Sequence, residues 1–193
     1  MKNKSFWILC FLLFVISVSA QKKESEKFWE RLSSLCGKSF EGEIKNGGKP
    51  EDGFSGKRLV MQMLSCENNQ IKIPFYVGED KSRTWIITRD NEGLLSLRHE
   101  HRKSDGVMDE ITNYGGKSTN QGLEHLQIFP ANTLTASMLP AAAANVWFLG
   151  LDEKSFSYSL QRMGQQRIFT VAFDLQTPIE FDDRPWGYTN NSK

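Results

Sequence analysis

Short runs of alternating apolar and polar residues, separated by turn-forming residues, occupy most of the chain from residue 39 onward. Side chains of a β-strand alternate between two faces, so this period predicts strands that bury one face. The expected strands are residues 39–45, 57–66, 70–77, 83–89, 94–102, 107–114, 122–128, 145–152, 155–162 and 167–175. A flat sheet of about ten strands would leave two unpaired edges. The sequence therefore predicts an all-β fold, an antiparallel meander barrel of about eight to ten strands.

Two segments do not follow this period. Apolar residues in 25–36 are spaced as one face of a helix, for which Ser25 is the expected N-cap. If a barrel follows, this helix is expected to cover one of its ends. A short helical connection is expected near 131–143, where Asn132 or Thr133 could be the N-cap. We interpret this connection as packing on the barrel rather than as a mobile lid.

The first 20 residues have the features of a secretory signal peptide. Lys2 and Lys4 precede an apolar run at 6–16, and small residues follow it. That run is too short to span a bilayer, and no later run is long enough. We therefore expect a secreted or periplasmic protein that does not insert into a membrane after cleavage. The predicted organisation is a signal peptide at 1–20, a single domain at 21–187 and a flexible tail at 188–193.

Cysteine content and charge narrow the possible partners. Cys10 lies in the leader, which leaves Cys36 and Cys66. In an oxidising compartment these two most simply form one disulfide, which closes a loop of about 30 residues and stabilises by roughly 3 kcal/mol. Two free thiols or a metal pair are the alternative. The net charge of +1 becomes −1 without the two leader lysines, so no excess of positive charge points to nucleic acid. We expect a monomer with a small-molecule partner.

Hairpin register decides which side chains face the barrel interior. We expect one hairpin turn to be centred between Asn91 and Glu92. A second turn is expected to be centred between Asp105 and Gly106, because this register places oppositely charged side chains across from each other. The expected cross-strand pairs are Thr84 with His99, Ser82 with His101, Ile86 with Leu97, Trp85 with Arg98, Leu97 with Tyr114, His99 with Thr112, His101 with Glu110 and Arg102 with Asp109. An apolar floor then grades into a polar mouth, as a ligand pocket requires. The predicted ligand-binding residues are Thr84, Ile86, Leu97, His99, His101, Thr112 and Tyr114.

His99 and His101 have three interpretations. They are hydrogen-bonded histidines at a barrel end, ligand contacts, or metal ligands completed by Glu110. The main functional hypothesis is non-catalytic binding of a small, partly apolar molecule. One alternative is a metal-dependent or acid–base enzyme that uses both histidines, assisted by Tyr114 or Glu110. The sequence assigns no cofactor.

No catalytic motif supports the enzyme hypothesis. Gly53-Phe54-Ser55-Gly56 lacks the spacing of a nucleophile elbow and belongs to a Gly/Pro-rich loop at 46–56. We therefore favour a protein that is not an enzyme. A further alternative is a cell-envelope adaptor that binds another protein through an exposed face around Trp85, Arg98 and Trp186.

Several motifs resemble a family of uncharacterised exported bacterial proteins. The matching segments are Leu35-Cys36-Gly37-Lys38, Ile73-Pro74-Phe75, Val77-Gly78-Glu79-Asp80, Ser82-Arg83-Thr84-Trp85, His101-Arg102, Asp105-Gly106 and Tyr114-Gly115-Gly116. The resemblance spans nearly the whole mature chain and implies export, but no activity. Its pattern includes His99, His101, Thr112 and Tyr114 but not Glu110, which favours a His/Thr/Tyr patch over a metal triad. The expected architecture is similar to that of lipocalin and fatty-acid-binding barrels, a likeness that implies no function.

Overall fold

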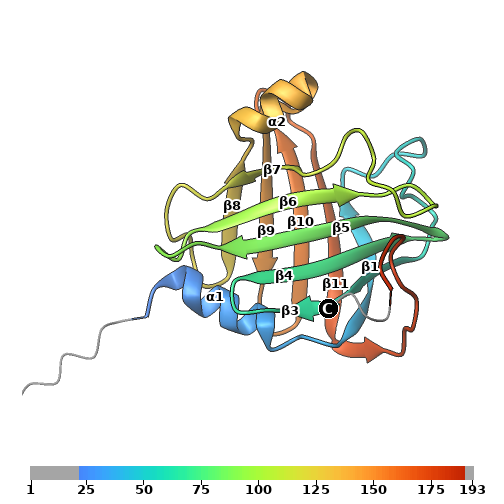
Figure 1. Ribbon diagram of the computed structural model, residues 1–193, viewed down its shortest axis with the longest axis horizontal. Helices are drawn as coiled ribbons and strands as arrows, with labels where there is room; N and C mark the ends of the chain where they lie inside the picture. The colour runs from blue at the N-terminus through green and yellow to red at the C-terminus, as the bar shows by residue number, and fades with distance from the viewer. Residues whose placement is uncertain (1–21, 190–193) are drawn as a thin grey trace, which may run out of the picture.

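The computed structural model describes residues 22–189 as one antiparallel sheet that curls into a nearly closed barrel (Figure 1). Its strands are β1 (Ser39–Asn46), β2 (Leu59–Gln62), β3 (Ser65–Cys66), β4 (Gln70–Val77), β5 (Asp80–Arg89), β6 (Leu95–His101), β7 (Tyr114–Lys117), β8 (Leu126–Pro130), β9 (Asn145–Leu151), β10 (Ser155–Arg162) and β11 (Ile168–Ile179). The order around the barrel is β7-β6-β5-β4-β2-β1-β11-β10-β9-β8, and the short β3 pairs with β4. The predicted all-β barrel is confirmed.

The barrel closes where β7 meets β8, the two ends of the strand order. Gly116 forms an isolated bridge with Ala131, and a Cβ on Gly116 would lie 2.0 Å from the carbonyl oxygen of Pro130. Gly115 donates its N–H to the hydroxyl of Thr135, which lies in the helical connection above the seam, at 2.6 Å. The two strands can approach this closely only because their contact residue has no side chain.

An N-terminal helix, α1 (Glu24–Ser33), covers one end of the barrel with the buried side chains of Phe28, Trp29 and Leu32 (Figure 1). The expected N-cap is wrong, because Lys23 is in the cap position and Ser25 is the second residue of the helix. The Ser25 hydroxyl is buried and donates to the carbonyl oxygen of Gly93 at 2.6 Å. This bond anchors the helix to the β5–β6 turn.

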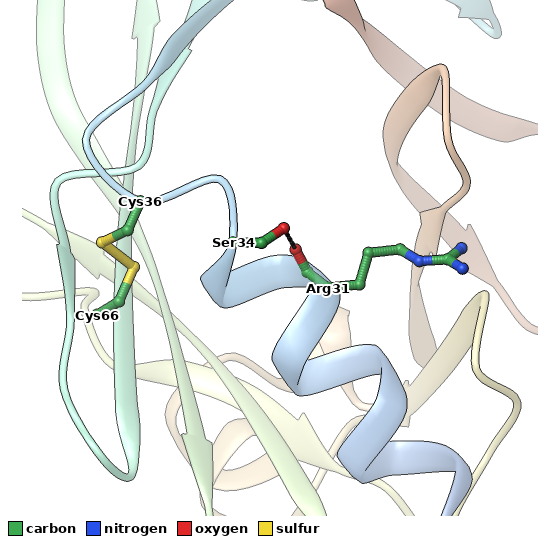
Figure 2. The surroundings of a disulfide bond; sticks show 4 residues. All are labelled: Arg31, Ser34, Cys36 and Cys66. Carbon is green, nitrogen blue, oxygen red and sulfur yellow. Dashed lines mark hydrogen bonds between the residues drawn. A yellow bond between two sulfur atoms is a disulfide. The ribbon is translucent and has the colours of Figure 1, made fainter.

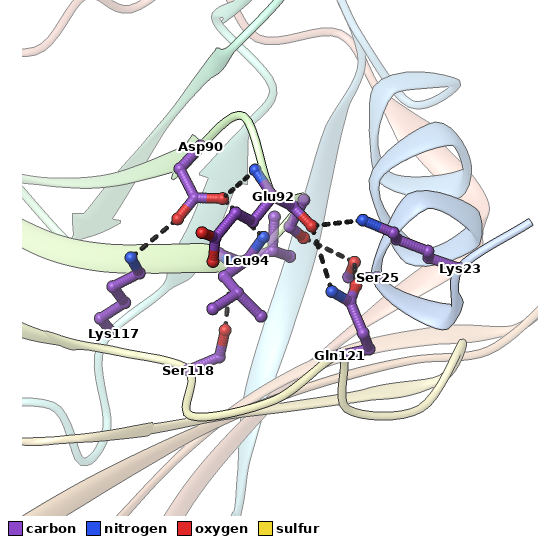
Figure 3. A network of polar contacts seen from close by, with 10 residues as sticks. Lys23, Ser25, Asp90, Glu92, Leu94, Lys117, Ser118 and Gln121 are labelled. Carbon is purple, nitrogen blue, oxygen red and sulfur yellow. Dashed lines mark hydrogen bonds and ion pairs between the residues drawn. The ribbon is translucent and has the colours of Figure 1, made fainter.

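Figure 3 shows the polar network around that anchor. The ammonium of Lys23 and the side-chain amide of Gln121 both donate to the carbonyl oxygen of Glu92, at 2.6 and 3.2 Å. Lys117 pairs with Asp90 at 2.7 Å on the same turn. Hydrogen bonds and an ion pair therefore join α1, the β5–β6 turn and the segment after β7 at the barrel end that α1 covers. The opposite end of β6 is free to border a cavity.

The expected helical connection is present near the other end of the barrel (Figure 1). It consists of α2 (Thr133–Met138) followed by the 3-10 turn η1 (Pro140–Ala142). Asn132 is the N-cap, since its side-chain oxygen accepts from the N–H of Thr135 at 2.9 Å. Of the two expected N-caps, Asn132 and Thr133, the structure has Asn132.

The chain beyond β11 lies along the outer wall of the barrel. The hydroxyl of Tyr188 donates to Glu100 at 2.8 Å, and Lys81 pairs with Asp183 at 2.7 Å. Tyr188, which we had assigned to the tail, thus contacts the barrel wall. The predicted signal peptide and residues 190–193 lie outside the described part of the chain. Among residues 22–189, no helix is both long enough and apolar enough to cross a membrane.

The β5–β6 hairpin differs from the expected register by one residue. Trp85 faces His99 and Arg83 faces His101, where we had expected Thr84 and Ser82. The turn has an odd number of residues: the carboxylate of Asp90 accepts from the N–H of Glu92 and of Leu94, and Gly93 has a φ of 81°. A shift by one residue moves every β5 side chain to the other face of the sheet.

The expected strand at 107–114 is largely absent, and β7 begins only at Tyr114. The hydroxyl of Thr112 accepts from the N–H of His101 at 2.8 Å, and Asn113 has a φ of 61°. A side chain thus replaces a backbone partner and ends the regular ladder. His99 consequently faces Tyr114 rather than Thr112, and Leu97 faces Gly116 rather than Tyr114. Arg102 faces Met108 rather than Asp109.

The expected disulfide between Cys36 and Cys66 is present, with a Cα–Cα distance of 6.1 Å (Figure 2). It joins the segment after α1 to β3. Its removal in the Cys36→Ser/Cys66→Ser double variant is expected to lower the free energy of unfolding by about 3 kcal/mol, because the unfolded chain regains the entropy of an open loop.

Urea unfolding of this variant beside the oxidised and reduced wild-type protein measures the effect. The reduced wild type is the control and should match the double variant. Equal midpoints for oxidised and reduced protein would contradict the prediction.

Candidate functional site

A cavity of about 310 Å³ opens at the end of the barrel opposite α1. Its lining combines aromatic and aliphatic side chains with polar ones. The apolar and aromatic set is Phe54, Phe75, Trp85, Tyr114, Tyr158, Leu160 and Phe169, and the polar set is Asp52, Arg83, Thr84, His99, Glu100, His101 and Arg167. These residues come from six strands, the loop after β1 and the β10–β11 turn, so only the closed barrel brings them together.

Three cross-strand rows on the inner face of β4 to β7 produce a gradient of polarity. The deepest row is Ile71, Ile87, Leu97 and Gly116, the next is Ile73, Trp85, His99 and Tyr114, and the row at the mouth is Phe75, Arg83 and His101. The deepest row is buried in the core. An apolar floor therefore changes into a polar mouth, as we had expected, although β5 and β7 contribute different residues.

His99 is 5 % exposed and both of its ring nitrogens have partners. Nδ1 lies 3.2 Å from the carbonyl oxygen of Tyr114, which only accepts, so Nδ1 carries the proton. Nε2 then accepts from the hydroxyl of Tyr158 at 2.9 Å. Burial lowers the pKa of His99 to about 3, with a smaller contribution from His101 in the same direction. His99 is therefore a neutral wall residue at neutral pH.

His101 lies nearer the mouth and is partly exposed. Its Nε2 is 3.1 Å from the hydroxyl of Tyr114, and the two rings are stacked at 5.6 Å. Burial and the positive charge of Arg83 lower the pKa of His101, while Asp109, Asp80 and Glu100 act against this shift. A neutral imidazole and a phenol thus form the polar pair beside the cavity.

The loop after β1 covers part of the mouth with the ring of Phe54. This ring lies 5.2 Å from that of Phe169 and 6.0 Å from that of Phe75. The carboxylate of Asp52 accepts from the backbone N–H of Lys49, Phe54 and Ser55, and these bonds lower its pKa to about 2. Because Asp52 ties the loop together, Phe54 is held over the cavity rather than in solvent.

Two arginines lie at the mouth. Arg83 forms an ion pair with Asp80, and its guanidinium carbon is 5.3 Å from the centre of the Phe54 ring. Arg167 comes from the β10–β11 turn and donates to the carbonyl oxygen of Gly47 at 2.7 Å through Nε. Both cations therefore border the cavity from opposite walls.

Of the predicted ligand-binding residues, His99, His101 and Tyr114 border the cavity from the inner face. Thr84 also borders it, but it faces Glu100 in a row on the outer face of the sheet. The other expected residues do not. Ile86 faces Arg98 and borders a separate outer pocket, because the β5 register differs. Leu97 lies on the inner face but below the cavity, where it is fully buried. Thr112 lies in the irregular segment before β7.

The metal triad, one of the three interpretations of the two histidines, does not form. Glu110 is exposed, and within residues 22–189 no group of three histidine, cysteine, aspartate or glutamate side chains could hold a metal ion. The two nitrogens of His99 are also engaged by Tyr114 and Tyr158. The free-thiol alternative for Cys36 and Cys66 is likewise replaced by the disulfide.

Our sequence reasoning missed most of the aromatic lining. Tyr158 and Leu160 alternate along β10, and Phe169 begins the same pattern on β11, so a period-two signal was present. Trp85 was expected on an exposed face for partner binding, but it is 3 % exposed and stacks on Tyr158 at 4.6 Å. The expectation was wrong because it used the register that is shifted by one residue.

Comparison of the chain with protein-family models, curated proteins and solved structures gives no match. Any functional inference must therefore come from the cavity itself.

Proposed function

We propose that this protein binds a small, partly apolar molecule in the barrel cavity and does not transform it. The proposal rests on the cavity of about 310 Å³, which is lined by aromatic rings and bordered by a few polar groups at one end. Pockets for small ligands have volumes from about 300 Å³ upward and this same distribution of apolar and polar groups. Apolar lining drives binding, and fixed polar groups orient the ligand.

The protonation states of the polar groups support binding over acid–base catalysis. An efficient general acid or base has a pKa near the working pH. Burial moves the pKa of His99 down to about 3 and the pKa values of Tyr114 and Tyr158 up. At neutral pH these groups hold their protons in place and supply hydrogen bonds of fixed direction.

Export is part of the proposal. The Cys36–Cys66 disulfide suits an oxidising compartment, and the leader-like residues 1–20 support secretion. The protein would then meet its ligand in the periplasm or outside the cell.

Phenylnaphthylamine, a neutral dye that becomes fluorescent in apolar surroundings, provides a direct test. We expect saturable binding with a Kd of roughly 100 µM or tighter, on the efficiency usual for ligands of this size. Leu160→Trp adds volume on the inner face and is expected to weaken binding about tenfold. The matched control is Ile128→Trp, because Ile128 is 40 % exposed on the outer face.

Each variant is first checked for a cooperative thermal transition. Equal affinity in both variants would place the dye outside the cavity and count against the proposal. Absence of saturable binding to the wild-type protein would have the same effect.

A further inference from the structure

The inner wall of the cavity holds a guanidinium with unused hydrogen-bonding capacity. Arg83 lies on β5 between Phe75 and His101 in the row at the mouth. Within the described part of the chain, only Nη1 of Arg83 has a protein acceptor, the carboxylate of Asp80. A guanidinium has further N–H donors on Nε and Nη2. These donors remain available to a molecule in the cavity.

The acceptors at the mouth are, in contrast, already engaged. Both oxygens of Asp52 accept from backbone N–H groups of its own loop. Glu100 borders the cavity, but its carboxylate accepts from Arg102 and Tyr188 on the outer face of the sheet. Asp80 accepts from Arg83 and from the backbone N–H of Ser82. The mouth therefore offers donors rather than acceptors, which favours an anionic group over a cationic one.

The pair formed by His101 and Tyr114 adds one donor in either tautomer. If Nε2 of His101 donates to the Tyr114 hydroxyl, that hydroxyl still has its own proton to give. If Nε2 accepts from the hydroxyl, the proton of the ring is on Nδ1 instead. Either arrangement leaves one N–H or O–H close to Arg83.

We propose that the ligand is an amphipathic anion, with a carboxylate or sulfonate group bound by Arg83 beside the His101–Tyr114 pair and an apolar body against the aromatic lining. This inference rests on the proposed function and names the class of ligand. Charge-assisted bonds of this kind are shorter and stronger than neutral ones, and a guanidinium matches the geometry of an oxyanion. The second arginine of the mouth, Arg167, increases the positive potential on the opposite wall.

Two dyes with the same ring system test the inference. Anilinonaphthalene sulfonate carries a sulfonate, and phenylnaphthylamine does not. We expect the wild-type protein to bind the sulfonate at least about tenfold more tightly. In Arg83→Gln this advantage is expected to disappear, while the affinity for the neutral dye changes less than about twofold. Arg83→Lys, which keeps the charge but not the planar fork, is expected to give an intermediate affinity for the sulfonate.

The matched control is Arg98→Gln, which removes one positive charge from an exposed position on the outer face. It is expected to bind both dyes as the wild type does. Equal wild-type affinity for the two dyes, or an equal loss of both in Arg83→Gln, would overturn this inference and leave the proposed function intact. If neither dye binds the wild-type protein, the proposed function fails and the inference fails with it.

Discussion

Replacing Gly116 with alanine is expected to lower the free energy of unfolding by about 4 kcal/mol or more, which places it among the largest effects of a single substitution. The added Cβ would lie 2.0 Å from the carbonyl oxygen of Pro130 and 2.7 Å from its carbon. These are backbone atoms, so no side chain can rotate away. The clash is relieved only if β7 and β8 separate, which opens the barrel at its seam.

Thermal unfolding of Gly116→Ala should therefore show a melting temperature lower by roughly 10 °C or more. Gly53→Ala is the control, because a Cβ there meets nothing within 4 Å. Gly53 has a φ of 78°, so alanine at this position should cost only about 1 kcal/mol. If the two variants melt together, the seam is not the reason for a glycine at position 116.

Stability is expected to decrease as the pH is lowered from 6.5 toward 3.5, with His99 contributing about 1.4 kcal/mol per pH unit, or about 4 kcal/mol in all. The folded protein holds His99 neutral because burial lowers its pKa from 6.5 to about 3. The unfolded chain binds a proton at this residue below pH 6.5, whereas the folded protein does not. Proton binding thus favours the unfolded state throughout this interval, and the stability is restored as the pH rises.

Urea unfolding of the wild type and of His99→Gln at several pH values isolates this contribution. The variant should be less stable at neutral pH, since it loses bonds to Tyr114 and Tyr158, but its stability should fall less steeply with acidification. The control is His125→Gln, which removes an imidazole from an exposed position. Parallel curves for the wild type and His99→Gln would show that His99 is not the responsible group.

The sequence alone determined the all-β fold, the two helical segments and the inward row of β6. His99 and His101 face the interior because alternation is a property of each strand, set by its own backbone. The disulfide was equally predictable, since only two cysteines follow residue 20. Each of these features can be predicted from the pattern of residues within one segment, or from the number of residues of one type.

The pairing register of the hairpins was harder to predict, although the turn residues that set it lie close together in the sequence. Asp90 and Gly93 set a turn with an odd number of residues, whereas we had assumed a turn with an even number. One residue of error replaced Arg83 and Trp85 by neighbours on the outer face. The charge pairs on which the other hairpin depended are worth only a few tenths of a kcal/mol each, less than the turn geometry and the Thr112 side chain that decide the pairing.

The cavity itself was decided only by the tertiary structure. Phe54 comes from a loop, Tyr158 from β10 and Phe169 from β11, and they meet Arg83 and His101 because the strand order closes between β7 and β8. A sequence pattern states which face of a strand is buried, but not which strands stand opposite each other across a barrel. That arrangement depends on closure between residues far apart in the chain, where backbone contact at Gly116 and the packing of the whole core act together.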